Sequence, residues 1–277
     1  MMVAEYPNIS DEELPGWESW IESATGIVLR GRKQVLEQGI YPRLVACGVE
    51  NLQDYRTLIE LGQGGAMEKA ALIDQLTVKD TRFFRNEEAM SAVGQYLRRR
   101  SREIAQEQRP LRIWSVGCAL GQEAYSLGMI ASECFDFTEV DWEVLGTDIS
   151  PTAVMKASRG VYADKQVKGL SPNRMRRFFK AVDEGWQVEE SLRGRVSFGA
   201  SNLRHIESCP FTAQDVIFCQ NVLIYFREET VNHIVNQFVE RLRPGGLLVL
   251  GAGEAPDWNS SRVARWLPGQ LNAYRVS

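Results

Sequence analysis

The segment at residues 111–123 reads LRIWSVGCALGQE, and it joins a short apolar run to two glycines and a carboxylate. The apolar run ends at Val116, and Gly117 and Gly121 follow where a strand would turn into a helix. Glycine permits the backbone conformations of such a turn and lets a ligand approach the chain closely. The segment therefore predicts the first strand of an open α/β sheet, with a ligand-binding loop at its carboxyl end.

Further apolar runs follow this first strand and are separated by helical stretches. They lie at residues 142–148, 195–200, 215–221 and 246–252. Several are apolar almost throughout, which is typical of parallel strands that are buried on both faces. The alternation of strand and helix predicts a doubly wound, Rossmann-like α/β sheet, to which residues 273–277 could add one more strand.

An amphipathic helix is expected before the last long run. Val231, Ile234, Val235 and Phe238 recur at the spacing of one helix face. The helix should stop at residues 243–246, whose sequence RPGG is a turn signal.

The chain before residue 110 has a helical pattern throughout. Trp17, Trp20, Ile21 and Ala24 fall on one helix face, and further helices are expected at residues 32–45, 52–61, 67–76 and 87–106. We therefore expect three parts. They are a small all-helical N-terminal domain at residues 1–86, a linking helix at 87–109, and the α/β domain at 110–277 with a small insert near 170–195.

Composition excludes several classes of protein. The 277 residues carry 36 acidic and 32 basic side chains, a net charge of −4, so no basic field argues for nucleic acid. No apolar run approaches the ~20 residues that cross a bilayer, and the acidic N-terminal segment does not resemble a secretory signal. Five scattered cysteines fit a reducing compartment, and two histidines offer no metal-ligand spacing. We expect a cytoplasmic protein without a metal ion or an inserted membrane segment.

Two cofactor classes suit the glycine loop at residues 117–121. A dinucleotide fold needs the spacing G-x-G-x-x-G, which lets a pyrophosphate bind the helix N-terminus. Here the spacing is G-x-x-x-G, and Glu123 enters the helix, where it would repel a pyrophosphate and attract the ammonium group of a methionine moiety. Asp148, at the end of the second run, can accept hydrogen bonds from both hydroxyls of a ribose. The loop favours S-adenosylmethionine over a nicotinamide cofactor, and the glycines alone also permit a tight turn with no ligand.

Three segments carry a resemblance to a known family. Residues 79–86 read KDTRFFRN, residues 117–126 read GCALGQEAYS, and residues 219–226 read CQNVLIYF. They are similar to the signatures N-x-T-x-F-F-R, G-C-S-T-G-E-E-P-Y-S and C-R-N-V-x-I-Y-F, in that order, of the CheR-type chemotaxis receptor methyltransferases. The resemblance extends from about Trp17 to Tyr274.

The sequence also departs from these signatures. Lys79 stands for asparagine and Gln220 for arginine. Within the glycine loop, four residues differ from the signature: Ala119, Leu120, Gln122 and Ala124. Before Glu254, Ala252-Gly253 replaces the His-Ser of the family.

The resemblance implies roles for individual residues. The implied cofactor contacts are Lys79, Thr81, Arg85, Gly117, Glu123, Asp148, Asn202, Leu203, Asn221 and Val222. Glu123 would bind the methionine ammonium group, Asp148 the adenosine ribose, and Asn202-Leu203 would flank the adenine. Arg85 and Tyr225 would be catalytic: Arg85 would orient the acceptor carboxylate with its planar fork, and Tyr225 would lie beside the methyl group.

The resemblance also implies the reaction and the partner. These enzymes transfer a methyl group from S-adenosylmethionine to glutamate side chains of methyl-accepting chemoreceptors, leaving a glutamyl methyl ester and S-adenosylhomocysteine. A glutamate has a reference pKa of ~4.3, so it is an anion near pH 7 and needs no general base. We expect a monomer whose helical region reads the receptor, with Arg30, Arg32, Lys33 and Arg43 as a docking patch.

Other interpretations remain open from the residues. Residues 221–225 faintly resemble the Asn-Pro-Pro-Tyr signature of DNA amino-methyltransferases, so the acceptor could be nucleic acid or a small molecule. The departures near Ala119, Gln122 and Gln220 are compatible with a non-catalytic, cofactor-binding component of a chemosensory system. Structural roles are also possible: Arg85 could pair with a neighbouring helix, Asp148 could cap the helix that begins at Pro151, and Glu123 could pair with a lysine.

Overall fold

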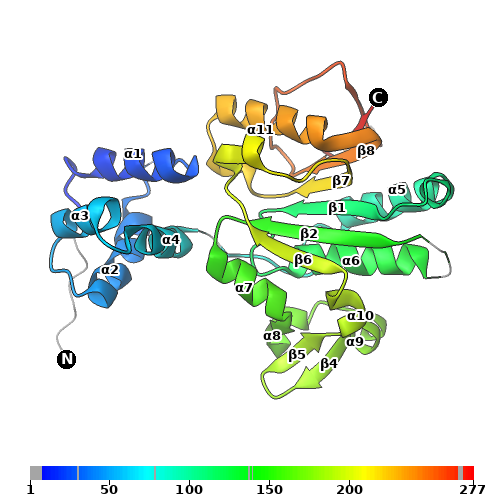
Figure 1. Cartoon of the computed structure of the whole chain (residues 1–277), viewed down its shortest axis with the longest axis horizontal. Coiled ribbons are helices and arrows are strands. Elements are labelled where there is room, and N and C mark those ends of the chain that lie inside the picture. Colours follow the sequence, from blue (N-terminus) through cyan, green and yellow to red (C-terminus); the bar gives the residue numbers. More distant parts are fainter. Residues whose placement is uncertain (1–7, 30, 78, 137, 139, 268–270) are drawn as a thin grey trace.

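The computed structural model describes residues 8–29, 31–77, 79–136, 138, 140–267 and 271–277, and it consists of a helical region beside a sheet with helices on both faces (Figure 1). The helical region contains α1 (Leu14–Thr25), α2 (Lys33–Cys47), α3 (Leu52–Leu61) and α4 (Gly65–Leu76). Their apolar faces close a small core, in which the rings of Trp17 and Tyr55 stack with their centroids 6.3 Å apart. The predicted helical N-terminal region is confirmed.

Local signals set the ends of these helices. Gly26 and Gly48 end α1 and α2 in the left-handed conformation, with φ of 79° and 64°, which glycine adopts without steric cost. Asn86 caps α5 (Glu87–Gln106), because its side-chain oxygen accepts the N–H of Ala89. These caps position the segments that lead from the helical region to the sheet.

The main sheet has seven strands in the order β6-β2-β1-β7-β8-β10-β9. They are β1 (Leu111–Val116), β2 (Trp142–Asp148), β6 (Val196–Ala200), β7 (Gln214–Cys219), β8 (Leu242–Leu250), β9 (Val263–Arg265) and β10 (Ala273–Val276). The first five in spatial order are parallel, and β10 and β9 add antiparallel strands at one edge. The strand order reverses beside β1, which is the arrangement of a doubly wound sheet. The predicted Rossmann-like fold, including the extra strand near residue 273, is confirmed.

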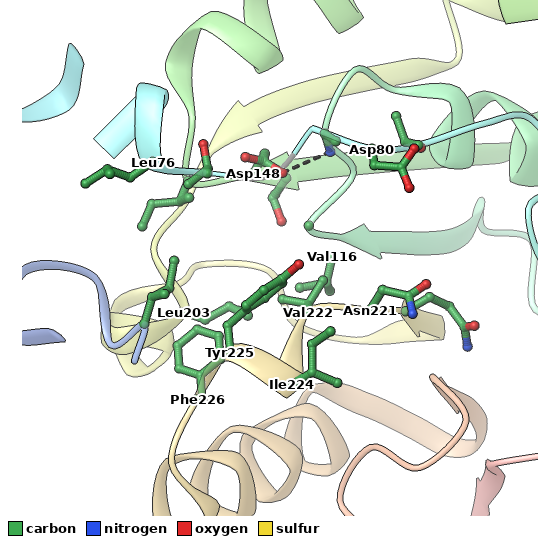
Figure 2. A pocket seen from close by; sticks show the side chains of 18 of the residues that line it. Leu76, Asp80, Val116, Asp148, Leu203, Asn221, Val222, Ile224, Tyr225 and Phe226 are labelled. Atoms are coloured by element: carbon green, nitrogen blue, oxygen red, sulfur yellow. Dashed lines mark hydrogen bonds between the residues drawn. The ribbon is translucent and has the colours of Figure 1, made fainter. Parts of the chain in front are cut away.

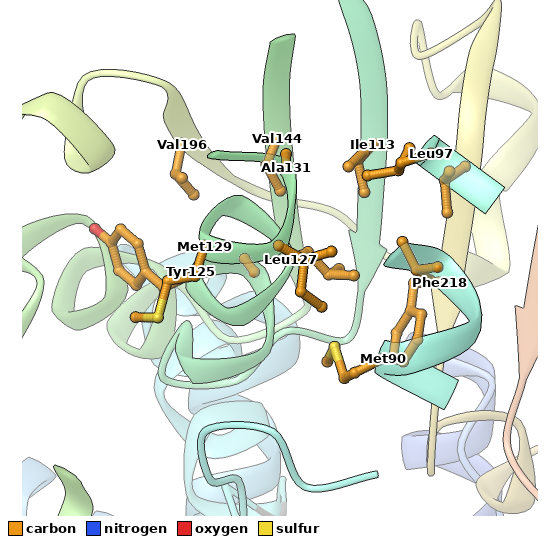
Figure 3. Packing of buried hydrophobic residues seen from close by; sticks show 14 of the residues in the cluster. Met90, Leu97, Ile113, Tyr125, Leu127, Met129, Ala131, Val144, Val196 and Phe218 are labelled. Carbon is orange, nitrogen blue, oxygen red and sulfur yellow. The ribbon is translucent and has the colours of Figure 1, made fainter. Parts of the chain in front are cut away.

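Helices cover both faces of this sheet. On one face, α5 and α6 (Gln122–Phe135) pack against Ile113, Val144 and Phe218, as Figure 3 shows. On the other face, α11 (Glu228–Arg241) packs against the alternate strand residues, and the rings of Trp114 and Phe238 lie 5.6 Å apart. Because β1, β7 and β8 are covered on both sides, their sequences are apolar almost without interruption.

One predicted boundary is wrong. The strand β8 begins at Leu242 and includes residues 243–246, which were expected to form a turn. Gln214 of β7 pairs with Leu242, whereas Val216 pairs with Leu247, so an irregularity in the register takes up the extra residues. Such irregularities let a strand accommodate proline and glycine without breaking the sheet.

A smaller antiparallel sheet lies between β2 and β6 along the chain. After α7 (Pro151–Arg159), β3 (Val161–Tyr162), β5 (Gly185–Val188) and β4 (Phe179–Val182) pair in that order, with short helices α8 (Asp164–Val167), α9 (Pro172–Phe178) and α10 (Glu190–Arg193) around them. Figure 1 shows this unit below the main sheet. The ring of Phe83 packs between Tyr162 and Phe179, with centroid distances of 5.0 and 5.5 Å. Phe83 therefore joins the segment at residues 79–86 to this unit, as a core residue.

Candidate active site

A cleft lies between the carboxyl edge of the parallel strands and the helical region (Figure 2). The carboxyl ends of β1 and β2, with Val116 and Asp148, and the loops that follow β1, β2, β6 and β7, with Leu203, supply most of its walls. Leu76 of α4 closes it from the helical side. The cleft therefore lies beside the point where the strand order reverses, the usual ligand site of an open α/β sheet.

Nearly all of the predicted site residues line this cleft. They are Thr81, Arg85, Gly117, Glu123, Asp148, Asn202, Leu203, Asn221, Val222 and Tyr225. Lys79 is not among the lining residues: its ammonium group lies 3.0 Å from a carboxylate oxygen of Asp74 and donates to the Asp74 carbonyl oxygen at 2.8 Å. The structure thus gives Lys79 a partner in α4 rather than a place in the cleft.

The carboxylate of Asp148 is fixed at the tip of β2 by the backbone. One oxygen accepts the N–H of Ser150 and the other accepts the N–H of Ala119, each at 2.9 Å, and Figure 2 draws the second bond. Burial raises the pKa of Asp148, while these two bonds and the charge of Lys79 act to lower it. Asp148 does not cap α7, because Ser150 does so by accepting the N–H of Ala153. That structural interpretation of Asp148 is wrong.

Glu123 lies in the first turn of α6 and accepts a hydrogen bond from the Ser115 hydroxyl at 2.8 Å. The pKa of Glu123 is raised to about 8, chiefly by burial and also by the nearby charge of Glu254, although the Ser115 bond and the Arg85 charge act to lower it. A lysine partner, the structural alternative, is not found for Glu123 within the described part of the chain. The carboxyl group is therefore available to a cation that enters the cleft.

The turn between β1 and α6 depends on glycine. Gly117 has φ of 69°, and a Cβ atom at this position would collide with the side chain of Val222. Gly121 has φ of 88° and precedes the first residue of α6. These positions let the loop pass close to the cleft, as the sequence predicted.

Arg85 is held within its own loop at residues 79–86. Its guanidinium donates to the Asp80 carbonyl oxygen at 2.8 Å and lies 3.5 Å from the Asp80 carboxylate, which is 81% exposed. The neighbouring Phe84 N–H donates to the Ser126 hydroxyl of α6 at 3.0 Å. Among the described residues, Arg85 pairs with Asp80 of its own loop and with no neighbouring helix, and the guanidinium borders the cleft.

The loop after β7 carries Asn221 and Tyr225. Asn221 has φ of 60°, a left-handed conformation that asparagine tolerates better than most residues. Figure 2 shows the Tyr225 ring pointing into the cleft. The Val28 N–H donates to the Tyr225 carbonyl oxygen at 2.8 Å, so the helical region supports this loop. The Asn202 side chain likewise donates to the Ala24 carbonyl oxygen at 2.9 Å.

Sequence analysis missed the part of the cleft that the helical region supplies. Ile27, Leu29, Val35 and Leu76 line it, although none of them was predicted as a site residue. Ile224 also lines the cleft and is 52% exposed. The only feature of the sequence that could have pointed to Ile224 as a site residue is its place within the motif at residues 219–226.

Three residues of the expected docking patch have contacts within the structure. Arg43 forms a half-buried ion pair with Glu68, whose carboxylate also accepts the Tyr55 hydroxyl at 2.6 Å, so Arg43 stabilises the helical region from inside. Lys33 lies 3.4 Å from Asp11, and Arg32 lines the cleft. Arg30 lies outside the described residues.

Two further expectations concern metal ions and membranes. Among the residues that the structure describes, no three histidine, cysteine or acidic side chains cluster to hold a metal ion. No helix within the described ranges combines the length and the apolar character that crossing a bilayer requires.

Comparisons with known proteins show which family the chain resembles. The family model described as CheR methyltransferase, SAM binding domain, matches residues 79–268. A chemotaxis protein methyltransferase of Vibrio parahaemolyticus is 33% identical over 254 residues, which cover 89% of this chain and 90% of that protein. Chemotaxis protein methyltransferase 1 of Pseudomonas aeruginosa is 35% identical over 245 residues, covering 85% of this chain and 87% of that protein.

Solved structures with related architecture are more distant. The magnesium protoporphyrin IX methyltransferase of Synechocystis, solved with bound S-adenosylmethionine, is 14% identical with a TM-score of 0.40, over 81% of this chain and 90% of that one. The family assignment rests on the sequence relatives and the matched model. The chain belongs to the CheR methyltransferase family, and it is a methyltransferase that uses S-adenosylmethionine.

Proposed function

We propose that this enzyme methylates glutamate side chains in the cytoplasmic domain of a methyl-accepting chemoreceptor, forming glutamyl methyl esters. Family membership over most of the chain carries the proposal, because the curated relatives are named chemotaxis protein methyltransferases. The meeting of Arg85, Glu123, Asp148 and Tyr225 in one cleft supports it.

The residue types in the cleft fit S-adenosylmethionine. Glu123 would hold the ammonium group of the methionine moiety, because a buried carboxyl that forms no ion pair with the described residues gains most from such a charge. Asp148 would accept hydrogen bonds from the ribose hydroxyls, since each of its oxygens uses only one bond to the backbone. Asn202 and Leu203 would flank the adenine. Thr81, Gly117, Asn221 and Val222 would complete the cradle.

When bound, S-adenosylmethionine supplies a methyl group on a sulfonium, and the acceptor carboxylate takes this methyl while S-adenosylhomocysteine is released. The enzyme must hold the two reactants in near-attack contact, ~3–3.5 Å apart. Positive and negative charges neutralise during the step, so a cation beside the acceptor should bind it only moderately. Arg85 suits this role because Asp80 already shares its charge. The ring or the hydroxyl of Tyr225 would hold the methyl group and keep water out of the reacting region.

The parts of the chain would divide this work. Residues 1–86 would read the receptor, and residues 87–109 would link them to the α/β domain. Residues 110–277, which contain the small insert near 170–195, would bind the cofactor. Arg32 and the exposed Ile224 border the cleft, where an acceptor segment would enter. The enzyme would act as a monomer in the cytoplasm on a membrane-bound receptor.

The test is incubation of the full chain with tritiated S-adenosylmethionine and membranes that contain chemoreceptors. Alkali-labile label on the receptor is the expected result, because methyl esters hydrolyse in alkali. Alkali-stable label would point to nitrogen methylation, and label on nucleic acid in a filter-binding assay would point to another acceptor. Binding of S-adenosylhomocysteine without any transfer to receptors would indicate a non-catalytic component and would contradict the proposal.

A further inference from the structure

Glu254 is a buried carboxylate that has no role in the site described so far. Its side chain is only 2% exposed, and it lies in the loop that follows β8. One oxygen accepts the N–H groups of Val222 and Leu223, each at 2.8 Å, and the other accepts the N–H of Gly251 at 2.7 Å. A single carboxylate thus joins the loop after β7 to the loop after β8.

The loop that Glu254 holds carries part of the candidate site. Asn221, Val222 and Tyr225 lie in residues 221–226, which we name the β7 loop, and all three line the cleft. Val222 packs so closely on Gly117 that a side chain at Gly117 would collide with it. A shift of Val222 would therefore move the β7 loop relative to the glycine turn.

Glu254 is itself firmly anchored. The Asn272 side chain donates to the carbonyl oxygens of Gly251 and Glu254, at 2.9 and 2.7 Å. A Cβ atom on Gly251 would collide with the Glu254 carboxylate, so this position suits glycine. The anchor and the bonds to the β7 loop together form a rigid connection behind the cleft.

We propose that Glu254 is a positioning residue, which sets the place of Asn221 and Tyr225 in the cleft through the backbone of the β7 loop. The consequence for catalysis rests on the proposed function, because it assumes that Tyr225 acts beside the transferred methyl group. An ionised carboxylate suits the task, because it accepts hydrogen bonds at both oxygens, whereas an amide accepts at only one.

The amino end of β7 offers a matched control for Glu254. Asp215 of β7 is 1% exposed, accepts the Arg112 N–H at 2.9 Å and pairs with Arg109. Like Glu254, it is a buried acid bonded to the backbone, but it lies at the amino end of β7, away from the cleft. Glu254→Gln and Asp215→Asn therefore both replace a buried carboxylate by an amide, one behind the loop that follows β7 and one at the amino end of β7.

The experiment compares these two variants with the unchanged protein. Thermal unfolding should show that both lose stability. Receptor methylation should show that kcat falls about 10²-fold for Glu254→Gln, since small misplacements of reacting groups have costs of this size. The kcat of Asp215→Asn should stay within about twofold, as expected for a change outside the site. Equal kcat values for the two variants would overturn the proposal.

Amide hydrogen exchange tests the same idea without any receptor. Peptides that cover the β7 loop should exchange several-fold faster in Glu254→Gln than in Asp215→Asn. Equal exchange in the two variants would overturn the proposal. If the unchanged protein does not methylate receptors, the proposed function fails, and this measurement still decides whether Glu254 holds the loop.

A second variant covers the case in which Glu254→Gln does not fold. Gly251→Ala should displace the carboxylate by steric collision while leaving its charge in place. We expect a lower kcat and faster exchange in the β7 loop, as for Glu254→Gln. A folded Gly251→Ala protein with normal kcat and normal exchange would overturn the proposal.

Discussion

Single residues in the cleft show how burial prepares charged groups for a ligand. Glu123 and Asp148 both have raised pKa values, because burial disfavours the charged form of a carboxyl group more than the nearby cations favour it. Two backbone N–H groups donate to Asp148 and partly offset the cost of burying its charge, whereas only the Ser115 hydroxyl donates to Glu123 among the described residues. The ligand charge is thus expected to matter more at Glu123.

The first prediction concerns the pH dependence of binding at Glu123. With a pKa of about 8, this group is largely protonated at pH 7 in the free enzyme. An ammonium-bearing ligand favours the ionised form, so binding should release a proton. The Kd of S-adenosylhomocysteine should fall as pH rises from 6, by about tenfold per pH unit at first, and level off near pH 8. Calorimetric titration in buffers of different ionisation enthalpy measures both effects.

The raised pKa of Glu123 also makes the free energy of unfolding depend on pH. The folded chain holds this proton more tightly than the unfolded chain. The contribution of Glu123 to the free energy of unfolding is therefore fully present below pH 4.5, the ordinary pKa of a glutamate, and is lost as pH rises through about 8.

The binding prediction has its own control. Glu123→Gln should flatten the dependence of the S-adenosylhomocysteine Kd on pH, and a Kd that does not change with pH in the unchanged protein would contradict the role of Glu123.

The second prediction separates catalysis from cofactor binding. Arg85→Ala and Tyr225→Phe should bind S-adenosylhomocysteine with little change, yet their kcat for receptor methylation should fall by about 10²-fold. Arg82→Ala is the control, because this exposed arginine is in the same loop but does not line the cleft. Rates for Arg85→Ala or Tyr225→Phe that match the control would remove the corresponding role.

At the level of elements, α4 and α7 are joined by one buried group. The Asp74 carboxylate accepts the Ser150 hydroxyl and pairs with Lys79, while the Ser150 N–H donates to Asp148. The end of a helix in the helical region is thus connected to the carboxylate expected to bind ribose. No pattern in the sequence predicts this connection, because residues 74 and 150 are far apart along the chain.

The third prediction tests this connection. Asp74→Ala should lower the free energy of unfolding by about 1–3 kcal/mol, because it leaves buried donors without an acceptor. It should also weaken binding of S-adenosylhomocysteine, since Ser150 helps to fix Asp148. Urea unfolding and calorimetry measure the two effects.

Asp11→Ala is the matched control for Asp74→Ala. It also removes an acid paired with a lysine, but Asp11 is almost fully exposed and lies 3.4 Å from Lys33. Its loss should change stability by less than about 1 kcal/mol. If the two variants were equally stable, the α4–α7 connection would contribute nothing measurable.

For the whole molecule, the site depends on the contact between the helical region and the sheet. Gly26, at the end of α1, packs against the ring of Phe226, which directly follows Tyr225. An ion pair between Glu22 and Arg227 and the bond from Val28 to the Tyr225 carbonyl oxygen lie beside it. The helical region is therefore one wall of the cleft as well as the expected receptor-reading part.

The fourth prediction concerns this contact. Gly26→Ala and Gly48→Ala both place alanine in a left-handed conformation, at a cost of about 1–2 kcal/mol. At Gly26 the added Cβ would also lie 2.8 Å from the Phe226 ring, whereas the space around Gly48 is open. Gly26→Ala should therefore lose more stability and reduce kcat, while Gly48→Ala should keep its kcat. Equal kcat values would show that the contact does not influence the β7 loop.

The sequence by itself determined the order of helices and strands and most of the residues that meet in the cleft. Apolar periodicity, glycine turns and caps act between neighbours along the chain, so residues 111–123 were enough to predict the first strand, the turn and the position of Glu123. The strand boundary at residues 243–246 was wrong because a register irregularity depends on the partner strand β7.

The tertiary structure alone decided which distant groups meet. It paired Lys79 with Asp74, brought Ile27 and Leu29 to the cleft, and placed Glu254 behind the β7 loop. The physical reason is that such contacts depend on how the helical region and the loops close over the sheet. Periodicity and turn chemistry act over a few residues, and they hold no information about that closure.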